Sequence, residues 1–284
     1  AKKLRVKYIL THSFLIKDDS FDLWCKLENV ENGVALFSNK ISEPMAMTTQ
    51  MVGKLANDII TSLKVKTKQD VMKAPTINAE AYAFYLEAKY KHDNRKNMED
   101  IEISRGLLKK AIELDKNLSI AKNLMGNTYL STSDYDKAME IYSENLKQAE
   151  DIGDMVSIGS SLINIGIISL NTTGKYKFAL DNYNHALEIF EEIGDKYRMG
   201  IALGHIGSIY HREYDYKLAL EYYTRTLDIA EELDDKGLIA YTLLDIGGIY
   251  QFKDIDYVKA LEHYTRSLNI LEDIGDKHGI GKSL

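Results

Sequence analysis

The residues that could do chemistry are few, and histidines come first among them. His205 and His211 are six positions apart, a spacing that points them to different faces of one helix. His205 and Asp245 each stand two residues before a glycine that recurs along the chain, so we expect them to meet on neighbouring helices. We interpret this pair as a structural hydrogen bond and not as a metal or catalytic site.

Other catalytic and cofactor motifs are absent from the sequence. It has no Gly-x-x-x-x-Gly-Lys-Ser/Thr phosphate loop, no His-Glu-x-x-His zinc motif and no Gly-x-Ser-x-Gly nucleophile elbow. Cys25 is the single cysteine, which excludes zinc sites built on several thiolates and an internal disulfide. The sequence therefore predicts no catalytic residue, no metal and no cofactor in these 284 residues.

The charge balance argues against a nucleic-acid-binding chain. The net charge is −7, and Lys and Arg are interleaved with Asp and Glu instead of forming the basic stripe that phosphates require. No run of about 18 apolar residues is present, so we expect no membrane span and a cytoplasmic location. The chain begins without Met and ends inside a repeat, so we interpret it as a piece of a longer protein.

A repeated pattern of small residues and tyrosines occupies most of the chain and indicates stacked pairs of helices. Apolar residues at i, i+3, i+4 and i+7 predict amphipathic helices, and the recurring Gly and Ala allow two helices to approach closely. One pair cannot bury its apolar stripe alone, so neighbouring pairs must stack. The recurring positions are Gly126, Gly166, Gly207 and Gly247; Tyr135, Tyr176, Tyr216 and Tyr257; Ala138, Ala179, Ala219 and Ala260; and Tyr142, Tyr183, Tyr223 and Tyr264.

The ends of the predicted second helices share a second pattern. Gly153, Gly194 and Gly275 suit the left-handed residue that closes a helix. An acidic pair precedes each of them, and we interpret these pairs as a solvated rim and not as a stripe for a basic partner.

The repeats resemble the tetratricopeptide repeat family, whose first helix carries Gly followed by Tyr. Ser169 departs from the pattern by replacing that tyrosine in the third repeat. Later repeats step by 40 or 41 residues, longer than the family's usual 34, and resemble those of bacterial quorum-peptide regulators and animal spindle-orientation adaptors. The motif is carried by Gly126 with Tyr129, Gly207 with Tyr210, and Gly247 with Tyr250. Five repeats are predicted, at 78–116, 117–154, 157–195, 197–235 and 237–276, followed by the start of a sixth helix.

The first residues follow a different pattern, in which apolar and polar residues alternate. Strands are predicted at 5–10, 13–16, 21–27 and 34–41, with turns at Asp18–Ser20 and Glu31–Gly33. A helix is expected to follow, with Ser42 as its N-cap, Pro44 in its first turn, and an apolar face made of Met45, Val52, Leu55, Ile59 and Leu63.

This segment resembles the TolB-like domain of bacterial signalling proteins. The resemblance lies in Leu4–Leu10, the hairpin Leu27–Gly33, the helix end Ile60–Val65 and the junction Pro75–Tyr82. The expected fold is mainly α, a right-handed α-solenoid of tetratricopeptide-type helix pairs preceded by a small α+β segment with an antiparallel sheet and a helix. The expected domains are a partial TolB-like domain at 1–65, a linker at 66–77 and the repeats at 78–284.

The family geometry places the first helix of each pair on an inner, concave face, where a partner would bind. Asn side chains there can both donate to and accept from a peptide backbone. Asn127 and Asn164 match the family's carboxylate clamp, but Asn123, Ile201 and His205 stand where that clamp has Lys or Arg, so we do not expect a chaperone-tail clamp. The candidate groove residues are Tyr85, Lys89, Asn123, Asn127, Asn164, Ile167, Asn171, His205, Ser208, His211, Arg212, Asp245, Gln251 and Phe252.

The resemblances imply a non-catalytic scaffold that binds a protein or peptide and acts on an output domain of the same polypeptide. One alternative is the regulatory region of a class III nucleotide cyclase whose catalytic domain lies upstream. A winged-helix domain in that place would indicate a transcription regulator instead. A further alternative is a module for self-association.

Overall fold

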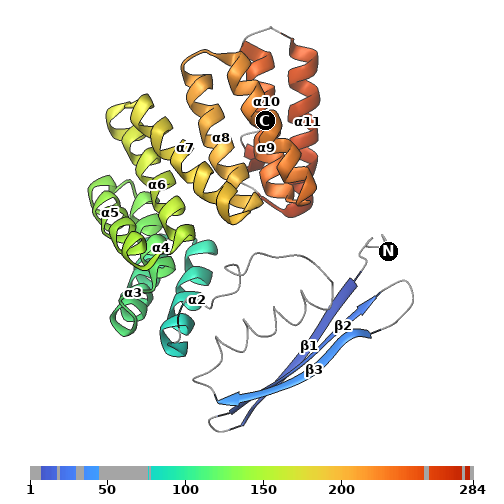
Figure 1. The fold of residues 1–284 in the computed structure, drawn as a ribbon. Helices are drawn as coiled ribbons and strands as arrows, with labels where there is room; N and C mark the ends of the chain where they lie inside the picture. Colours follow the sequence, from blue (N-terminus) through green and yellow to red (C-terminus); the bar gives the residue numbers. More distant parts are fainter. Residues whose placement is uncertain are drawn as a thin grey trace. The chain divides into compact units, whose positions relative to one another are not determined.

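The computed structural model describes residues 8–17, 20–29, 35–44, 76, 78–252, 256–276 and 279–281. The chain divides into two compact units, Ala1–Thr132 and Ser133–Leu284. Each unit has an apolar cluster of its own. The described helices form the predicted solenoid of helix pairs, and a small antiparallel sheet precedes them (Figure 1). The predicted boundary at 65–78 falls largely outside the described residues and stays a prediction.

The sheet has three antiparallel strands in the order β1-β2-β3, namely β1 (Tyr8–Lys17), β2 (Ser20–Asn29) and β3 (Ala35–Pro44). The alternation along β2 is confirmed, because Leu23, Cys25 and Leu27 are buried while Trp24 is exposed. Asp22 is also buried, and its carboxylate pairs with Lys40 at 3.1 Å and accepts a hydrogen bond from the Ser42 hydroxyl.

Two predictions for this segment are wrong. Residues 5–10 and 13–16 do not form separate strands; Tyr8–Lys17 is one strand, because all of it pairs with β2, from Tyr8 opposite Asn29 to Lys17 opposite Ser20. Ser42 and Pro44 do not start a helix. They end β3, which lies at an edge of the sheet, where a proline is tolerated. The turn at 31–33, the rest of the Asp18 turn and the apolar helix face from Met45 to Leu63 lie outside the described residues.

The helices of the first unit are α2 (Ala79–Asp93), α3 (Met98–Leu114) and α4 (Ser119–Leu130). The starts of α2 and α3 are set by side-chain caps, since Asn78 accepts from the Ala81 amide and Asn97 accepts from the Asp100 amide. The buried Ser104 hydroxyl donates to the Ala88 carbonyl at 2.9 Å and so joins α3 to α2. The first predicted helix pair is confirmed.

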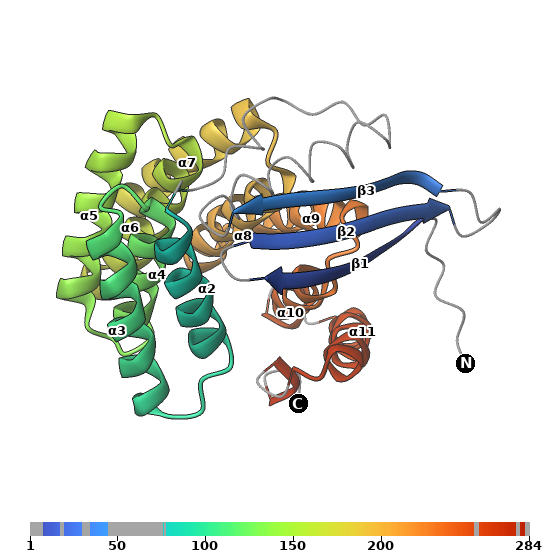
Figure 2. The same cartoon turned by 90° about the horizontal axis from the view of Figure 1, so that it is seen from below.

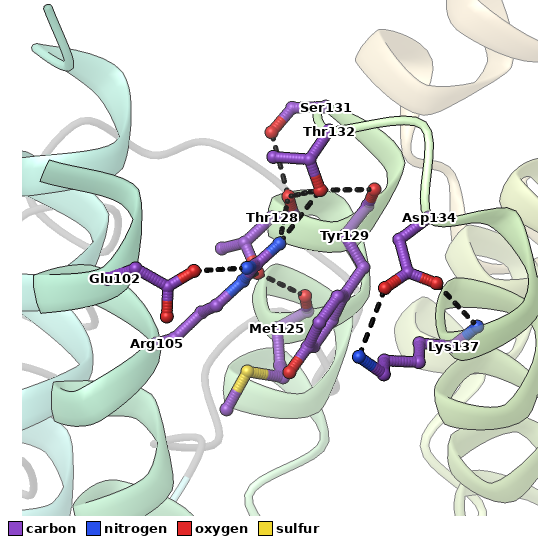
Figure 3. Close-up of polar contacts among 9 residues, drawn as sticks. All are labelled: Glu102, Arg105, Met125, Thr128, Tyr129, Ser131, Thr132, Asp134 and Lys137. Atoms are coloured by element: carbon purple, nitrogen blue, oxygen red, sulfur yellow. Dashed lines mark hydrogen bonds and ion pairs between the residues drawn. The ribbon is translucent and has the colours of Figure 1, made fainter. Parts of the chain in front are cut away.

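Arg105 connects α3 to α4 in this unit (Figure 3). Its guanidinium donates to the Thr128 hydroxyl at 3.1 Å, the Thr128 carbonyl at 3.0 Å and the Thr132 hydroxyl at 2.9 Å. It also pairs with Glu102 at 2.5 Å and lies 3.9 Å from the centre of the Tyr129 ring. Because its donors are occupied by the protein itself, we interpret Arg105 as a structural clamp.

The second unit consists of helices packed pairwise in chain order (Figures 1 and 2). They are α5 (Tyr135–Ile152), α6 (Met155–Thr173), α7 (Tyr176–Ile193), α8 (Lys196–Arg212), α9 (Tyr216–Glu232), α10 (Lys236–Phe252) and α11 (Tyr257–Ile274). The predicted left-handed ends are confirmed at Gly153, Gly194 and Gly275, with φ of 70°, 71° and 73°. Asp234 takes this conformation in the repeat that lacks the glycine. Residues 279–281 are helical, as the predicted sixth helix requires.

The acidic rim is partly paired with basic side chains of the same helix pair or of the next one. Lys196 pairs with Glu232, Lys236 pairs with Asp273 at 3.3 Å, and Arg266 pairs with Glu231 at 2.5 Å. All of these side chains are exposed, and such pairs contribute only about 0–1 kcal/mol each to stability. They are consistent with the solvated rim that the sequence suggested.

The close contact within the α6–α7, α8–α9 and α10–α11 pairs is a tyrosine ring lying on a glycine. A Cβ built on Gly166 would lie 2.5 Å from Cε1 of Tyr183, one on Gly207 would lie 2.8 Å from Cε1 of Tyr223, and one on Gly247 would lie 2.6 Å from Cε1 of Tyr264. The rings of Tyr183 and Tyr223 are buried. The recurring glycines are therefore the places where a second-helix ring approaches the first-helix backbone.

Helix α6 is unusually apolar. In the described part of the chain it alone is long and apolar enough to cross a membrane by length and composition, which the sequence analysis did not anticipate. Many of its residues, among them Ile158, Leu162 and Ile163, belong to the apolar cluster of the second unit. This burial is typical of the core helix of a folded domain.

The glycine contact yields a prediction within one helix. Gly207→Ala should destabilise the chain by about 1–3 kcal/mol, because the new methyl group would overlap the buried Tyr223 ring. Gly204→Ala, one turn earlier in α8, would place its methyl 3.8 Å from Thr226 and should be neutral or stabilising by up to about 1 kcal/mol. Urea unfolding of both variants measures the difference, and equal stabilities would contradict the proposed contact.

Candidate ligand-binding face of the first helices

In the second unit, the predicted groove residues lie on α6, α8 and α10, the first helices of their pairs. The structure surrounds several of them with second-helix tyrosines. Tyr183 from α7, Tyr223 from α9 and Tyr264 from α11 each pass beneath a glycine, and each interacts with predicted residues of the first helices. We call this arrangement the tyrosine face.

Tyr183 lies between α6 and α8. Its ring contacts Gly166 and stacks on His205, with ring centres 5.1 Å apart. Its hydroxyl is buried and has no hydrogen-bond partner among the described residues. Burial raises the pKa of Tyr183, and the positive charge of Arg212 partly counteracts that rise.

Tyr223 occupies the equivalent place one repeat later. Its ring lies on Gly207, and His211 meets it edge-on with ring centres 6.5 Å apart. Burial and the negative charge of Asp245 raise the pKa of Tyr223, while Arg212 lowers it. Arg212 and Asp245, from α8 and α10, therefore both act on this hydroxyl.

Tyr264 completes the series beside α10. Its hydroxyl donates to the Gln251 side chain at 2.9 Å, and it lies 3.7 Å from a Cβ built on Gly248. The His211 ring is also 3.7 Å from that position, so it reaches across from α8 to α10. Burial and Asp245 raise the pKa of Tyr264.

These shifts fix what the tyrosine face can do chemically. A tyrosine with a raised pKa keeps its proton at neutral pH, so it is a hydrogen-bond donor and not a nucleophile or base. The Tyr264 hydroxyl already donates to Gln251, so the Tyr183 hydroxyl and the Arg212 guanidinium are the donors that we consider for a carbonyl or carboxylate oxygen. The face is thus suited to binding acceptor groups.

Some predicted residues of the second unit have other roles. Ile167 packs against the apolar cluster, and the Ser208 hydroxyl donates to the His205 carbonyl of its own helix at 2.8 Å. Asn164 is half-buried, and Asn171 and Phe252 are exposed. Their place in a binding site stays a prediction.

The predicted residues of the first unit form a separate set. Tyr85 stacks on Tyr82 with ring centres 5.7 Å apart, and Lys89 pairs with Asp93 at 2.5 Å. Asn123 and Asn127 are half-buried on α4. These four positions stay predicted groove residues.

The His205 environment differs from the expectation. The contact that the structure gives its ring is the stack on Tyr183, and burial alone lowers the pKa of His205 to about 4. A carboxylate partner would raise that pKa. The predicted hydrogen bond to Asp245 therefore stays unconfirmed, and Asp245 acts instead on the tyrosines.

The second-helix tyrosines were not among the predicted site residues. The sequence did contain the signal, because Tyr183, Tyr223 and Tyr264 recur in step with Gly166, Gly207 and Gly247. We interpreted them only as core filling. A ring that covers a glycine can carry its hydroxyl through to the opposite face of the helix, and spacing alone does not show this.

Comparison with known proteins agrees with this architecture. A tetratricopeptide repeat family model matches residues 117–192 and 198–278, more than half of the chain. No curated protein sequence matches the chain significantly. The family match includes no residue before 117, so it gives the TolB-like resemblance no support.

Solved structures share the fold at low sequence identity. A Rap protein complexed with competence and sporulation factor has a TM-score of 0.63 at 16% identity, covering 84% of this chain and 67% of that one. The apo form of RapI has a TM-score of 0.55 at 16% identity, covering 84% and 88%. A signal transduction ATPase with numerous domains and a tetratricopeptide repeat sensor, from Pyrococcus horikoshii, has a TM-score of 0.59 at 22% identity, covering 72% of this chain. This chain matches only 31% of the length of that ATPase.

The lowered pKa of His205 predicts a pH dependence of stability. The folded state keeps this ring neutral down to about pH 4, whereas the unfolded chain protonates it near pH 6.5. Stability should therefore be full above pH 6.5 and fall by on the order of 2 kcal/mol as the pH drops toward 4. His205→Gln should flatten this loss.

The measurement is urea unfolding at several pH values, with His185→Gln as the matched control because His185 is exposed on α7. A residual slope should remain, since burial also lowers the pKa of His211 and His263. Parallel profiles for the His205 variant and the wild type would contradict the assignment.

Proposed function

This chain belongs to the tetratricopeptide repeat family, and we propose that it is a non-catalytic scaffold that binds a protein or peptide on its first-helix face. The ligand would be an extended polypeptide segment held by its carbonyl or carboxylate oxygens. The tyrosine face offers the donors for them, with Arg212 as the accompanying cation.

The observation that carries the proposal is the Tyr183 hydroxyl. It is buried, it has no partner among the described residues, and it lies where predicted groove residues gather. A buried donor without an acceptor costs about 1–3 kcal/mol, so such groups call for an explanation. A ligand acceptor oxygen that displaces the side chains covering this hydroxyl would satisfy it.

Fold-level likeness agrees with a binding role. The Rap structure mentioned above was solved as a complex with a factor, and the Pyrococcus protein carries repeats described as a sensor. By analogy, the present chain would be the regulatory part of a signalling protein that acts on an output domain. The TolB-like segment at 1–65, the cyclase alternative and the cytoplasmic location stay predictions, and the sequence upstream of Ala1 in the parent protein would test the first two.

Tyr183→Phe tests the binding face most cleanly. Loss of the hydroxyl should leave stability unchanged or higher, because the variant removes an unsatisfied buried donor. Affinity for a partner isolated with the whole chain should fall at least fivefold, measured by calorimetry. Tyr197→Phe on the exposed start of α8 is the control and should bind like the wild type.

A second variant tests the predicted Asn positions. Asn127→Ala combined with Asn164→Ala should weaken the same partner and leave the melting temperature nearly unchanged. Asp181→Ala combined with Glu188→Ala, both exposed on α7, serves as its control. Unaltered affinity in both the Tyr183 and the Asn variants would reject the first-helix face as the binding site.

Self-association is the second candidate function, and the outer face of α11 favours it. Tyr257, Val258 and Leu261 are 64%, 69% and 65% exposed, and the last two line a shallow cavity of about 620 Å³. An apolar surface of this kind is typical of a protein contact.

If this face joins two copies, the molar mass from light scattering should rise with concentration, and Leu261→Glu should abolish the rise. The control Thr224→Glu introduces the same charge at an exposed position of α9, away from this face. A monomer at all concentrations would exclude self-association through α11.

A further inference from the structure

A second cavity, of about 450 Å³, lies on the other side of the third repeat, among α5, α6 and α7. Its apolar wall includes Met139 and Leu146 from α5 and Ile165 from α6. Ser169 from α6 and Asn182 from α7 also line it. Its lining includes side chains of the second helices α5 and α7 as well as of the first helix α6. None of its lining residues belongs to the tyrosine face.

The cavity is explained by a difference between repeats. Ser169 stands where the next two repeats have Tyr210 and Tyr250. Tyr210 stacks on Tyr222 with ring centres 5.5 Å apart, and Tyr250 stacks on His263 at the same distance, with the rings nearly parallel in both cases.

Both partners of that stack are replaced in the third repeat. Asn182 takes the position of Tyr222 and His263, as Ser169 takes that of the tyrosine. The cavity therefore lies where the following repeats hold a pair of stacked rings. Phe178 does not fill it, because its side chain is 47% exposed.

The outer end of the cavity also differs in charge from the equivalent place in the next repeat. Burial raises the pKa of Tyr210, and Tyr222 and the carboxylates of Glu213 and Asp215, which follow it closely in the chain, add to the rise. The corresponding positions in the third repeat are Thr173 and Lys175, and both line the cavity.

Lys175 has a second consequence at this end of the cavity. Asp215 and Asp256 cap their helices, whereas α7 begins after Lys175 without a side-chain cap hydrogen bond. Amide donors at the start of a helix favour an acceptor or a negative charge. A ring seated here would thus have donors, and not carboxylates, at its outer end.

We propose that this cavity binds a single aromatic ring that carries an oxygen acceptor, such as an aryl carboxylate or a phenol. The ring would take the place that Tyr210 and Tyr250 occupy in their repeats, with its oxygen toward Lys175. The Thr173 hydroxyl already donates to the Ser169 carbonyl at 2.8 Å. The volume is sufficient, because a dry apolar cavity of roughly 150 Å³ already holds a benzene molecule. Free aromatic acids and tyrosine side chains share this chemistry.

The experiment uses the whole chain and follows amide shifts by NMR during titration with 4-methylbenzoate, p-cresol and 4-methylbenzylamine. The shifts should map to α5, α6 and α7. Affinity should be highest for 4-methylbenzoate and lowest for 4-methylbenzylamine, because the ammonium group of the latter would face the positive charge of Lys175. Ser169→Tyr should fill the cavity, weaken 4-methylbenzoate at least tenfold and leave the melting temperature equal or higher. Thr224→Tyr, exposed on α9, is the control and should bind normally.

A second variant places the serine and asparagine of the third repeat at the equivalent positions of the fourth. Tyr210→Ser with Tyr222→Asn should open a second p-cresol site in the fourth repeat, provided that the variant melts cooperatively. Acetyl-Ala-Tyr-Ala-amide distinguishes the two sources: binding through Ser169 indicates a polypeptide tyrosine, and binding of the free probes alone indicates a small molecule. Equal binding by wild type and Ser169→Tyr, or shifts for none of the probes, would overturn the proposal.

Discussion

The second unit depends on one contact, a tyrosine ring of α7, α9 or α11 lying on a glycine of α6, α8 or α10. Gly166, Gly207 and Gly247 leave no room for a side chain at these points, and the rings of Tyr183, Tyr223 and Tyr264 fill the space. This contact sets how closely each pair closes, and the apolar clusters then join one pair to the next. The Tyr183 ring also stacks on His205 of α8, and the Tyr264 hydroxyl donates to Gln251 of α10, so the same side chains contact predicted groove residues.

The same tyrosine side chains therefore take part both in core packing and in the candidate site. The raised pKa values follow from burial of the rings in the core and keep the hydroxyls as donors on the face. Variation between repeats then has local effects. Where Ser169 replaces a tyrosine the stack is lost and a cavity remains, and where Asp234 replaces a glycine the left-handed helix end is kept.

The helical fold could be predicted from the sequence because its determinants repeat. Glycine and tyrosine at fixed steps located the pairs, and Gly153, Gly194 and Gly275 located their ends. The sheet was harder to predict from the sequence. Thr11 and His12 interrupt the apolar pattern of β1, but pairing with β2 keeps them within one strand. The site was only partly predictable. Its tyrosines recur in step with the glycines, but spacing does not show which polar side chains of the neighbouring helices they contact.

The most direct test of this account is the distance between ring and glycine in solution. A nuclear Overhauser spectrum of the selectively labelled chain would report on Tyr183 with Gly166 and on Tyr223 with Gly207. The account predicts strong cross-peaks from the ring protons of each tyrosine to the α protons of its own glycine. Cross-peaks absent from both pairs, with the helices intact, would contradict the contact on which the fold and the binding face are built.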